Sequence, residues 1–373
     1  MPAAKERTNA MKNRILLVLT GGTIGSVCAD HVRGLTDDSP YLLLRELNRQ
    51  CPAYGDSAFD VTEPLRLLSE NLTPSHWAAL YQALSQADLT PYDGVIITHG
   101  SDTLAYTAAA MGMLLRHLPV PVVLIAADRP ADDPLSNAVP NLRAAVDFIR
   151  HGGRKGVFVS YRRYDDGAQV IYLATRLVSA DNCRDEFSAY GGQPLGIMAD
   201  GQFTENDAPW NPTARQLDFP YAPLVRGAFT LDRKVMLLRA YPGMDYTAIH
   251  PDGFAAVVQY GYHSATACTE GDATSLLSFA RRCRECGTSL WLGSFKRAEN
   301  ELYATSRDLL AAGILPFYDM SPEAAYAKAV LAYNLPLTGL TDMKEPEAFM
   351  GKGSLYYECV GTQTVYRRED GRA

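Results

Sequence analysis

The segment LVLTGGTIGS (17–26) decides the fold, because an apolar run ends there at two adjacent glycines flanked by hydroxyl residues. The run itself, RILLVLT (14–20), is typical of a buried parallel strand. The glycine spacing fits neither a P-loop, which needs a lysine, nor the G-x-G-x-x-G of a dinucleotide-binding turn. Two interpretations remain open. Thr23 is a nucleophile beside residues whose missing side chains let a substrate approach the backbone, or it caps a plain β–α turn.

The same strand-and-loop pattern recurs along the first half of the chain. Further strands are predicted at 93–100, 120–127, 156–161 and 169–174. Helical segments alternate with the earlier strands, which predicts an α/β fold with a parallel sheet and helices on both of its faces. Ligands bind such sheets beyond the carboxyl ends of the strands, where the loops after Leu19 and Thr98 both lie.

Length and composition predict two domains. Residues 1–205 are expected to form the larger N-terminal parallel-sheet domain, 206–230 a proline-marked linker, and 231–373 a smaller C-terminal α/β domain. Within the last of these, SPE (321–323) predicts a helix start, with a capping serine, a proline at the first helical position and an acid in the first turn.

Charge and cysteine content argue against several classes of protein. The 35 basic and 42 acidic residues give a net charge of -7 without long runs of one sign, so neither nucleic acid nor a membrane is expected as a partner. The apolar part of the N-terminus, 15–19, is too short for a signal peptide, which predicts a cytoplasmic location. Seven scattered cysteines with one CxxC pair, Cys283 and Cys286, predict neither a disulfide framework nor a metal site.

A second polar loop, THGSDTL (98–104), is expected at the same edge of the sheet. Its Ser101, Asp102 and Thr103 place hydroxyls beside a carboxylate, which can position a water molecule or bind a substrate ammonium group. Alternatively, Ser101 or Asp102 merely caps the helix that follows. Both loops on one chain, in order and after matching strands, are more specific than either alone.

TGGTIG followed by ITHGSDT resembles the two signature motifs of the bacterial-type L-asparaginase/glutaminase family. LLSENLTPSHW (67–77), NAVPNLRAAV (137–146) and DMSPEAAYAKA (319–329) are similar to further family segments, so the likeness covers most of the chain. The cytoplasmic (type I) form is the closer likeness. The resemblance implies an amidohydrolase that releases ammonia from the side-chain amide of L-asparagine or a related amino-acid amide. It also implies a homodimer or homotetramer that needs no metal or organic cofactor.

The resemblance implies three catalytic groups in these motifs. Thr23 is the nucleophile that attacks the amide and forms an acyl-enzyme. Ser101 stands where the family usually has threonine, the second catalytic hydroxyl, and keeps that hydroxyl while losing a methyl group. Asp102 contacts the substrate's α-amino group and orients the site. His99 is expected to be a buried structural histidine.

The same resemblance assigns the substrate-binding residues. Ser69 and Glu70 fall where the family binds the α-carboxylate and the α-amino group. Glu70 and Asp102 suit a cationic end, while backbone N–H groups around Gly22 and Gly100, with Ser69, suit an anionic one.

The chain departs from the family at the segment 172–189, where the family has a catalytic lysine and Arg176 is the best match. Arginine stays protonated, so Arg176 supplies charge but cannot act as a base. Lys155 precedes a strand and is therefore expected at the wrong end of the sheet.

The family's mobile lid also differs. The corresponding segment, 26–41, lacks the tyrosine that helps to activate the nucleophile. Arg33 or Leu35 lies near its position, Tyr41 comes too late, and His31 or Cys28 is a possible substitute. Three further residues replace a glycine- and asparagine-rich stretch of the family: Tyr262, His263 and Ser264.

These departures leave three functions open. The chain is an amidohydrolase of altered efficiency or substrate, or a relative that binds a small amino acid or amide without turnover. A specialised amidotransferase component is the third alternative, against which the lack of a basic patch and of a recognisable tRNA-binding domain argues.

Overall fold

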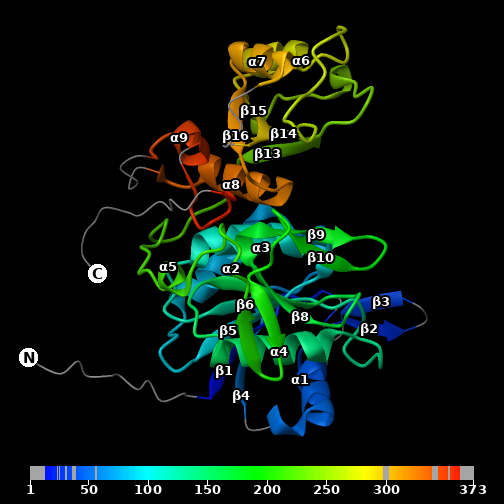
Figure 1. Cartoon of the computed structure of the whole chain (residues 1–373), viewed down its shortest axis with the longest axis vertical. Helices are drawn as coiled ribbons and strands as arrows, with labels where there is room; N and C mark the ends of the chain where they lie inside the picture. Colours follow the sequence, from blue (N-terminus) through cyan, green and yellow to red (C-terminus); the bar gives the residue numbers. More distant parts are fainter. Residues whose placement is uncertain are drawn as a thin grey trace, which may run out of the picture.

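The computed structural model describes residues 13–22, 24, 26–29, 32–35, 39–54, 57–296, 302–337, 343–351 and 353–361. Figure 1 shows two lobes, with a large sheet domain below and a smaller one above. The fold is the predicted two-domain α/β architecture. The predicted domain boundaries, 1–205, 206–230 and 231–373, remain predictions.

The large domain is built on an eight-stranded sheet with the order β12-β11-β8-β7-β6-β5-β1-β4. Five of its strands are parallel: β1 (Arg14–Val18), β4 (Ala58–Thr62), β5 (Gly94–Thr98), β6 (Val122–Ile125) and β7 (Val157–Arg162). The central strands β5 and β6 are buried at every residue, as expected of strands covered on both faces. The sequence prediction missed β4, whose side chains are only partly buried.

The other three strands run antiparallel to their neighbours: β8 (Gln169–Leu173), β11 (Gly196–Ala199) and β12 (Gln202–Glu205). A purely parallel sheet was therefore wrong for this edge. The connection 163–168 closes as a hairpin, in which the Arg163 N–H donates to the Ala168 carbonyl at 2.8 Å. A parallel pair would need a crossover of a dozen or more residues.

Helices cover both faces of the sheet. On one face lie α1 (Ser39–Gln50) and α4 (Ala138–His151), and on the other α2 (Pro74–Gln86) and α3 (Leu104–Leu115). Every residue of α3 except Tyr106 is buried, because α8 (Pro322–Asn334) packs on its outer side. A helix that is apolar all round is one that other elements enclose.

The smaller lobe holds four parallel strands in sequence order: β13 (Lys234–Arg239), β14 (Phe254–Tyr260), β15 (Ser289–Phe295) and β16 (Leu315–Tyr318). Its outer helices are α6 (Leu276–Glu285) and α7 (Ala304–Ala311), and a short α9 (Pro346–Gly351) lies beside α8. Helix α8 begins where SPE predicts, and the Ser321 hydroxyl accepts a hydrogen bond from the Ala324 N–H. One apolar core runs through both lobes, since Val95 and Trp291 belong to the same buried cluster.

Shorter elements connect these parts. Two antiparallel hairpins are formed by β2 (Ser26–Ala29) with β3 (Val32–Leu35), and by β9 (Leu177–Asp181) with β10 (Glu186–Ala189). The predicted linker packs along the large domain through a short helix, α5 (Ala214–Leu217), and the Tyr81 hydroxyl donates to the Val225 carbonyl at 2.9 Å. No helix among the described residues is long and apolar enough to cross a bilayer.

Helix α3 offers a test of the shared core. Leu114 is fully buried and Leu135 is 66% exposed. Leu114→Ala is expected to lower the free energy of unfolding by about 2–5 kcal/mol, since it leaves a cavity between the sheet and α8. Leu135→Ala, the same chemical change at the surface, should stay within about 0.5 kcal/mol of the parent. Urea unfolding measures both, and equal losses would contradict this core.

Candidate active site

Two glycines bring the predicted motifs into backbone contact at the carboxyl ends of β1 and β5. Gly22 has a φ of +80°, and a β-carbon added to it would lie 2.3 Å from the Gly100 nitrogen. A β-carbon on Gly100 would lie 2.2 Å from the Ser69 Oγ atom. The loop after β1, the loop after β5 and the turn at Ser69 therefore meet at one point, and only glycine fits at two of the three positions.

Hydrogen bonds hold these loops in register. The Thr20 hydroxyl donates to the Thr98 carbonyl at 2.7 Å, which ties the first loop to the end of β5. The Leu67 N–H donates to the Thr20 carbonyl and the Gly22 N–H to the Leu67 carbonyl, each at 3.1 Å. Because the Gly22 N–H is already bonded within the protein, Gly22 contributes space and backbone conformation, not the anion-binding donor that was expected.

The turn η3 (Ser69–Asn71) and the turn η4 (Ser101–Thr103) lie against each other. The Ser69 hydroxyl donates to Asp102 Oδ2 at 3.3 Å, and the Thr103 hydroxyl donates to the Ser69 carbonyl at 2.9 Å. Ser69 is buried, while Asp102 and Glu70 are exposed at the same place. This arrangement brings two carboxylates and two serine hydroxyls to one end of the sheet.

The alternative that Ser101 or Asp102 caps the following helix is wrong. Thr103 is the N-cap of α3, and no side chain makes a capping hydrogen bond there. The Ser101 hydroxyl and the outer part of the Asp102 carboxylate are therefore left for other contacts.

His99 is buried directly beneath the second loop, as expected. Its side chain is 2% exposed, and its Nδ1 lies 2.8 Å from the Gly100 carbonyl oxygen. Burial lowers the pKa of His99 from 6.5 to about 4, against the effect of the Gly100 carbonyl and of Asp102. The ring is thus neutral near pH 7 and supports the backbone of the loop.

Thr23, the predicted nucleophile, lies outside the described residues, as does His31. The residues on either side of Thr23, Gly22 and Ile24, are both buried. The role of Thr23 therefore stays a prediction that rests on its motif.

Arg176 belongs to the segment expected to carry the family's lysine, but its hydrogen bonds lead elsewhere. It is 1% exposed in the turn η5 (Ala174–Arg176), and its Nε donates to the Tyr357 carbonyl at 2.6 Å. Its Nη1 contacts Asn211 Oδ1 at 3.4 Å. Burial lowers the pKa of Arg176 to about 10, so the guanidinium remains charged. Lys155 is exposed at the amino end of β7, as expected.

The sequence prediction missed a buried lysine. Lys328 of α8 and Glu358 form an ion pair at 2.8 Å, with both side chains fully buried. The two residues lie on different elements and share no motif, so nothing in the local sequence indicated the pair.

The remaining candidate residues lie on the hairpins or at the surface. Cys28 and Arg33 are backbone partners in the β2–β3 hairpin, which corresponds to part of the expected lid. Tyr41 is 64% exposed on α1, and Tyr262 and His263 are exposed after β14. No group of three or more potential metal ligands occurs in the described part of the chain.

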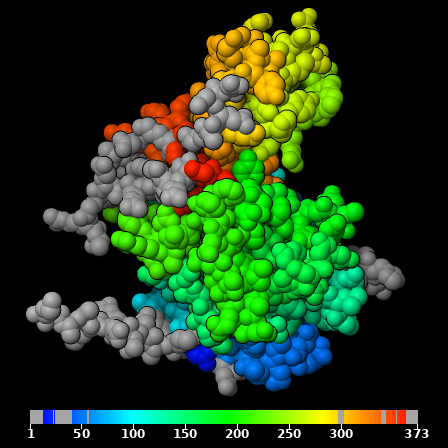
Figure 2. Space-filling view, viewed as in Figure 1, coloured from blue at the N-terminus to red at the C-terminus, as the bar shows by residue number. Residues whose placement is uncertain are grey.

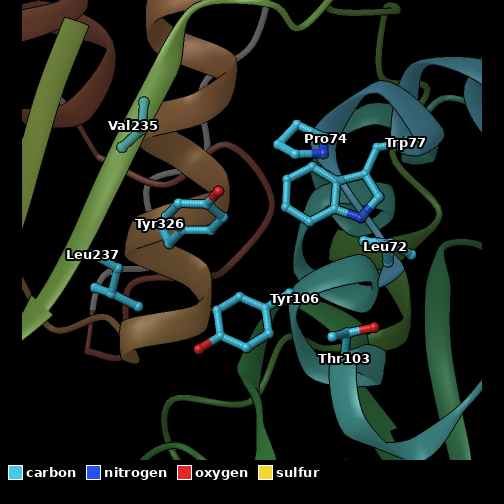
Figure 3. A pocket seen from close by; sticks show the side chains of 8 residues that line it. All are labelled: Leu72, Pro74, Trp77, Thr103, Tyr106, Val235, Leu237 and Tyr326. Atoms are coloured by element: carbon cyan, nitrogen blue, oxygen red, sulfur yellow. The ribbon is translucent and has the colours of Figure 1, made fainter. Parts of the chain in front are cut away.

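A cleft of about 420 Å³ lies next to these turns, between the two lobes. Figure 3 shows Trp77 and Tyr326 on opposite sides of it, with Tyr106 below. Thr103 and Leu72 form part of its wall, and each directly follows a turn of the candidate site. The predicted substrate-binding side chains do not line this cleft, so it is separate from their meeting point.

Comparison with known proteins agrees with this geometry. The family domain described as “Asparaginase, N-terminal” matches residues 14–210, more than half of the chain. The chain belongs to the asparaginase family. The match spans β1, both glycine loops and the antiparallel edge of the sheet.

Relatives of known name place this asparaginase-family chain near one group, the D-type subunit of glutamyl-tRNA(Gln) amidotransferase. The chain is 29% identical to this protein of Pyrococcus furiosus over 351 residues, 90% of this chain and 74% of that protein. It is 31% identical to the protein of the same name from Methanopyrus kandleri over 358 residues, 90% of this chain and 73% of the other.

Solved structures share the fold. The thermostable L-asparaginase of Thermococcus kodakarensis superposes with a TM-score of 0.70 at 25% identity, covering 94% of this chain and all of the other. L-asparaginase I of Vibrio cholerae gives a TM-score of 0.70 at 22% identity, covering 93% of this chain and 99% of the other, and shows the fold alone.

The contact between the glycine loops predicts a specific mutational effect. Gly22→Ala places a β-carbon against the Gly100 backbone and strains a positive φ, so it should separate the loops and abolish ligand binding at the site. Gly201→Ala is the matched control, because Gly201 has a φ of +73° with nothing within 4 Å. Calorimetric titration with L-aspartate measures binding, and equal effects of the two variants would contradict the contact.

His99 predicts a pH effect on stability. Its pKa is about 4 when folded and 6.5 when unfolded, so the unfolded chain binds more protons between these values. Stability from the neutral ring is complete above pH 6.5 and is lost as the pH falls, by up to about 3 kcal/mol. Urea unfolding from pH 7.5 to 4.5 should show a shallower slope in His99→Gln than in the parent. Parallel profiles would contradict the assignment.

Proposed function

We propose that this chain is an amidohydrolase that releases ammonia from the side-chain amide of L-asparagine or a related amino-acid amide. The meeting of the two glycine loops with the Ser69–Asp102 contact carries the proposal. Membership of the asparaginase family supports the class of reaction.

The substrate's charged ends match the side chains available. An amino-acid amide carries an ammonium group and a carboxylate, and the exposed carboxylates of Glu70 and Asp102 suit the ammonium group. The substrate carboxylate is assigned to Ser69 and to backbone N–H groups around Gly100. Ser69 already donates to Asp102, so binding of the carboxylate would turn its hydroxyl toward the substrate.

In the proposed reaction, the Thr23 oxygen attacks the amide carbon and forms a bond to it. The C–N bond then breaks, and the nitrogen leaves as ammonia with the proton that Thr23 gave up. Water next attacks the resulting ester, releases the acid and returns a proton to Thr23. Ser101 and Asp102 are assigned the transfer of these protons, and Arg176 supports the site without touching the substrate.

A second candidate function is that of a component of an amidotransferase. It is favoured by the similarity to the amidotransferase proteins of Pyrococcus furiosus and Methanopyrus kandleri over most of the chain. In that case the chain would need a protein partner for its full activity. We also propose the cytoplasmic location and a homodimer or homotetramer that the resemblance implies.

Ammonia release by the purified protein tests the proposal. L-asparagine, L-glutamine and their D-forms are the substrates, and Thr23→Ala is expected to lower the rate by at least about 10³-fold, since the nucleophile is lost. Thr230→Ala, the same change at an exposed site, is the control and should leave the rate unchanged. Thr23→Ser retains the hydroxyl and should keep measurable activity.

Two results would contradict the proposal. Activity that persists in Thr23→Ala would exclude this nucleophile. No release from any amide, together with a rise in melting temperature on adding L-aspartate, would show a protein that binds amino acids without turnover.

A further inference from the structure

The C-terminal segment 353–361 returns to the large domain and is buried where the two lobes meet. It is coloured red in Figure 2, between the green large domain and the orange part of the small lobe. Three consecutive carbonyl groups of this segment accept hydrogen bonds from the large domain. Arg116 donates to Leu355, the Thr175 hydroxyl to Tyr356 at 2.7 Å, and Arg176 to Tyr357 at 2.6 Å.

Glu358 holds the same segment from the other side. Its carboxylate accepts the N–H groups of Leu355 at 2.7 Å and of Tyr356 at 2.8 Å, and pairs with Lys328 at 2.8 Å. Lys328 also donates to the Gly353 carbonyl at 2.9 Å. Burial alone would raise the pKa of Glu358, but Lys328 and the two N–H groups hold it below the usual value. The charged pair therefore ties α8 to the segment 353–361.

The residues that grip this segment belong to η5, which packs against α3. A β-carbon on Gly112 of α3 would lie 2.5 Å from Thr175 Cγ2, so the two elements have no slack between them. Strand β9 follows η5 directly and contacts the turn η4 with Ser101 and Asp102. A displacement of 174–181 would therefore reach the second motif.

The C-terminal region also holds β9 at a second point. Oε1 of Glu323, in the first turn of α8, accepts the Ser179 N–H at 3.1 Å and the Ser179 hydroxyl at 2.7 Å. Glu323 is 3% exposed, so this contact is shielded from water. The segment 174–181 is thus fixed near both ends by residues that follow it by about 140 positions or more.

We propose that residues 353–361 form an interdomain clasp, and that the clasp and Glu323 together position the segment 174–181 and, through it, the turn η4. Arg176 and Glu358 are positioning residues in this arrangement. Where the family places a lysine at the second motif, this chain uses its arginine to anchor the clasp. The effect on catalysis rests on the proposed function, whereas the effect on local structure does not.

Three variants of the full-length chain test the clasp. Glu358→Gln removes the charge that pairs with Lys328, and Thr175→Val removes one anchoring hydrogen bond with little change in shape. Glu205→Gln is the matched control, because it breaks the Arg154–Glu205 pair, at 2.8 Å, elsewhere in the large domain. Hydrogen–deuterium exchange and steady-state kinetics are measured well below each melting temperature.

We expect faster exchange in 174–181 and 100–104 for Glu358→Gln, with α4 unchanged. We also expect kcat for ammonia release to fall about tenfold while KM changes less, because small displacements of catalytic groups are costly. Thr175→Val should act in the same direction with a smaller effect, and Glu205→Gln should match the parent in both measurements.

Faster exchange confined to 353–361, or spread evenly over the chain, would overturn the clasp as a positioning device. An unchanged kcat with only a lower melting temperature would also overturn it. If the parent hydrolyses no amide, the proposed function fails, and the exchange in 174–181 and 100–104 alone decides the clasp.

Discussion

The approach of Gly22 to Gly100 is the contact on which the candidate site depends. Strands β1 and β5 are neighbours in the sheet, so the loops that follow them leave from the same edge. A side chain on either glycine would overlap the opposing backbone or Ser69, and the loops would have to separate. The Thr20–Thr98 hydrogen bond and the neutral His99 then hold the loops at this short distance. The chemistry assigned to Thr23, Ser101 and Asp102 requires this convergence, because reacting groups must lie within a few ångströms of one substrate.

The second constraint comes from the far end of the chain. Helix α3 leads out of the Ser101–Asp102 turn and is enclosed by the sheet on one side and α8 on the other. The small lobe therefore does more than follow the large one, since its helix and the segment 353–361 form part of the packing behind the second motif. This coupling explains how a chain can keep the hydroxyls and carboxylate of the family while its arginine turns away from them. Geometry that a lysine would supply by direct contact is supplied here by packing and a buried ion pair.

Much of the fold follows from local sequence. Continuous apolar runs predicted β1, β5 and β6, and the serine, proline and glutamate at 321–323 predicted the start of α8. The antiparallel edge was missed because alternation with helices dominated the reading, while the short connection 163–168 carried the contrary signal. The motifs located the site, but the bond between the Gly22 N–H and Leu67 could not be read from them. Lys328 and Glu358 were also beyond prediction, since two charges thirty positions apart leave no periodic pattern.

The central claim is that the two loops form a site for nucleophilic amide hydrolysis at Thr23. The most direct measurement is rapid acid quenching of the protein during turnover of L-asparagine, followed by peptide mass spectrometry. The account predicts a covalent aspartyl ester on the peptide that contains Thr23, which is absent without substrate and from Thr23→Ala. Ammonia release without any adduct on that peptide, or with an adduct on a different residue, would contradict it.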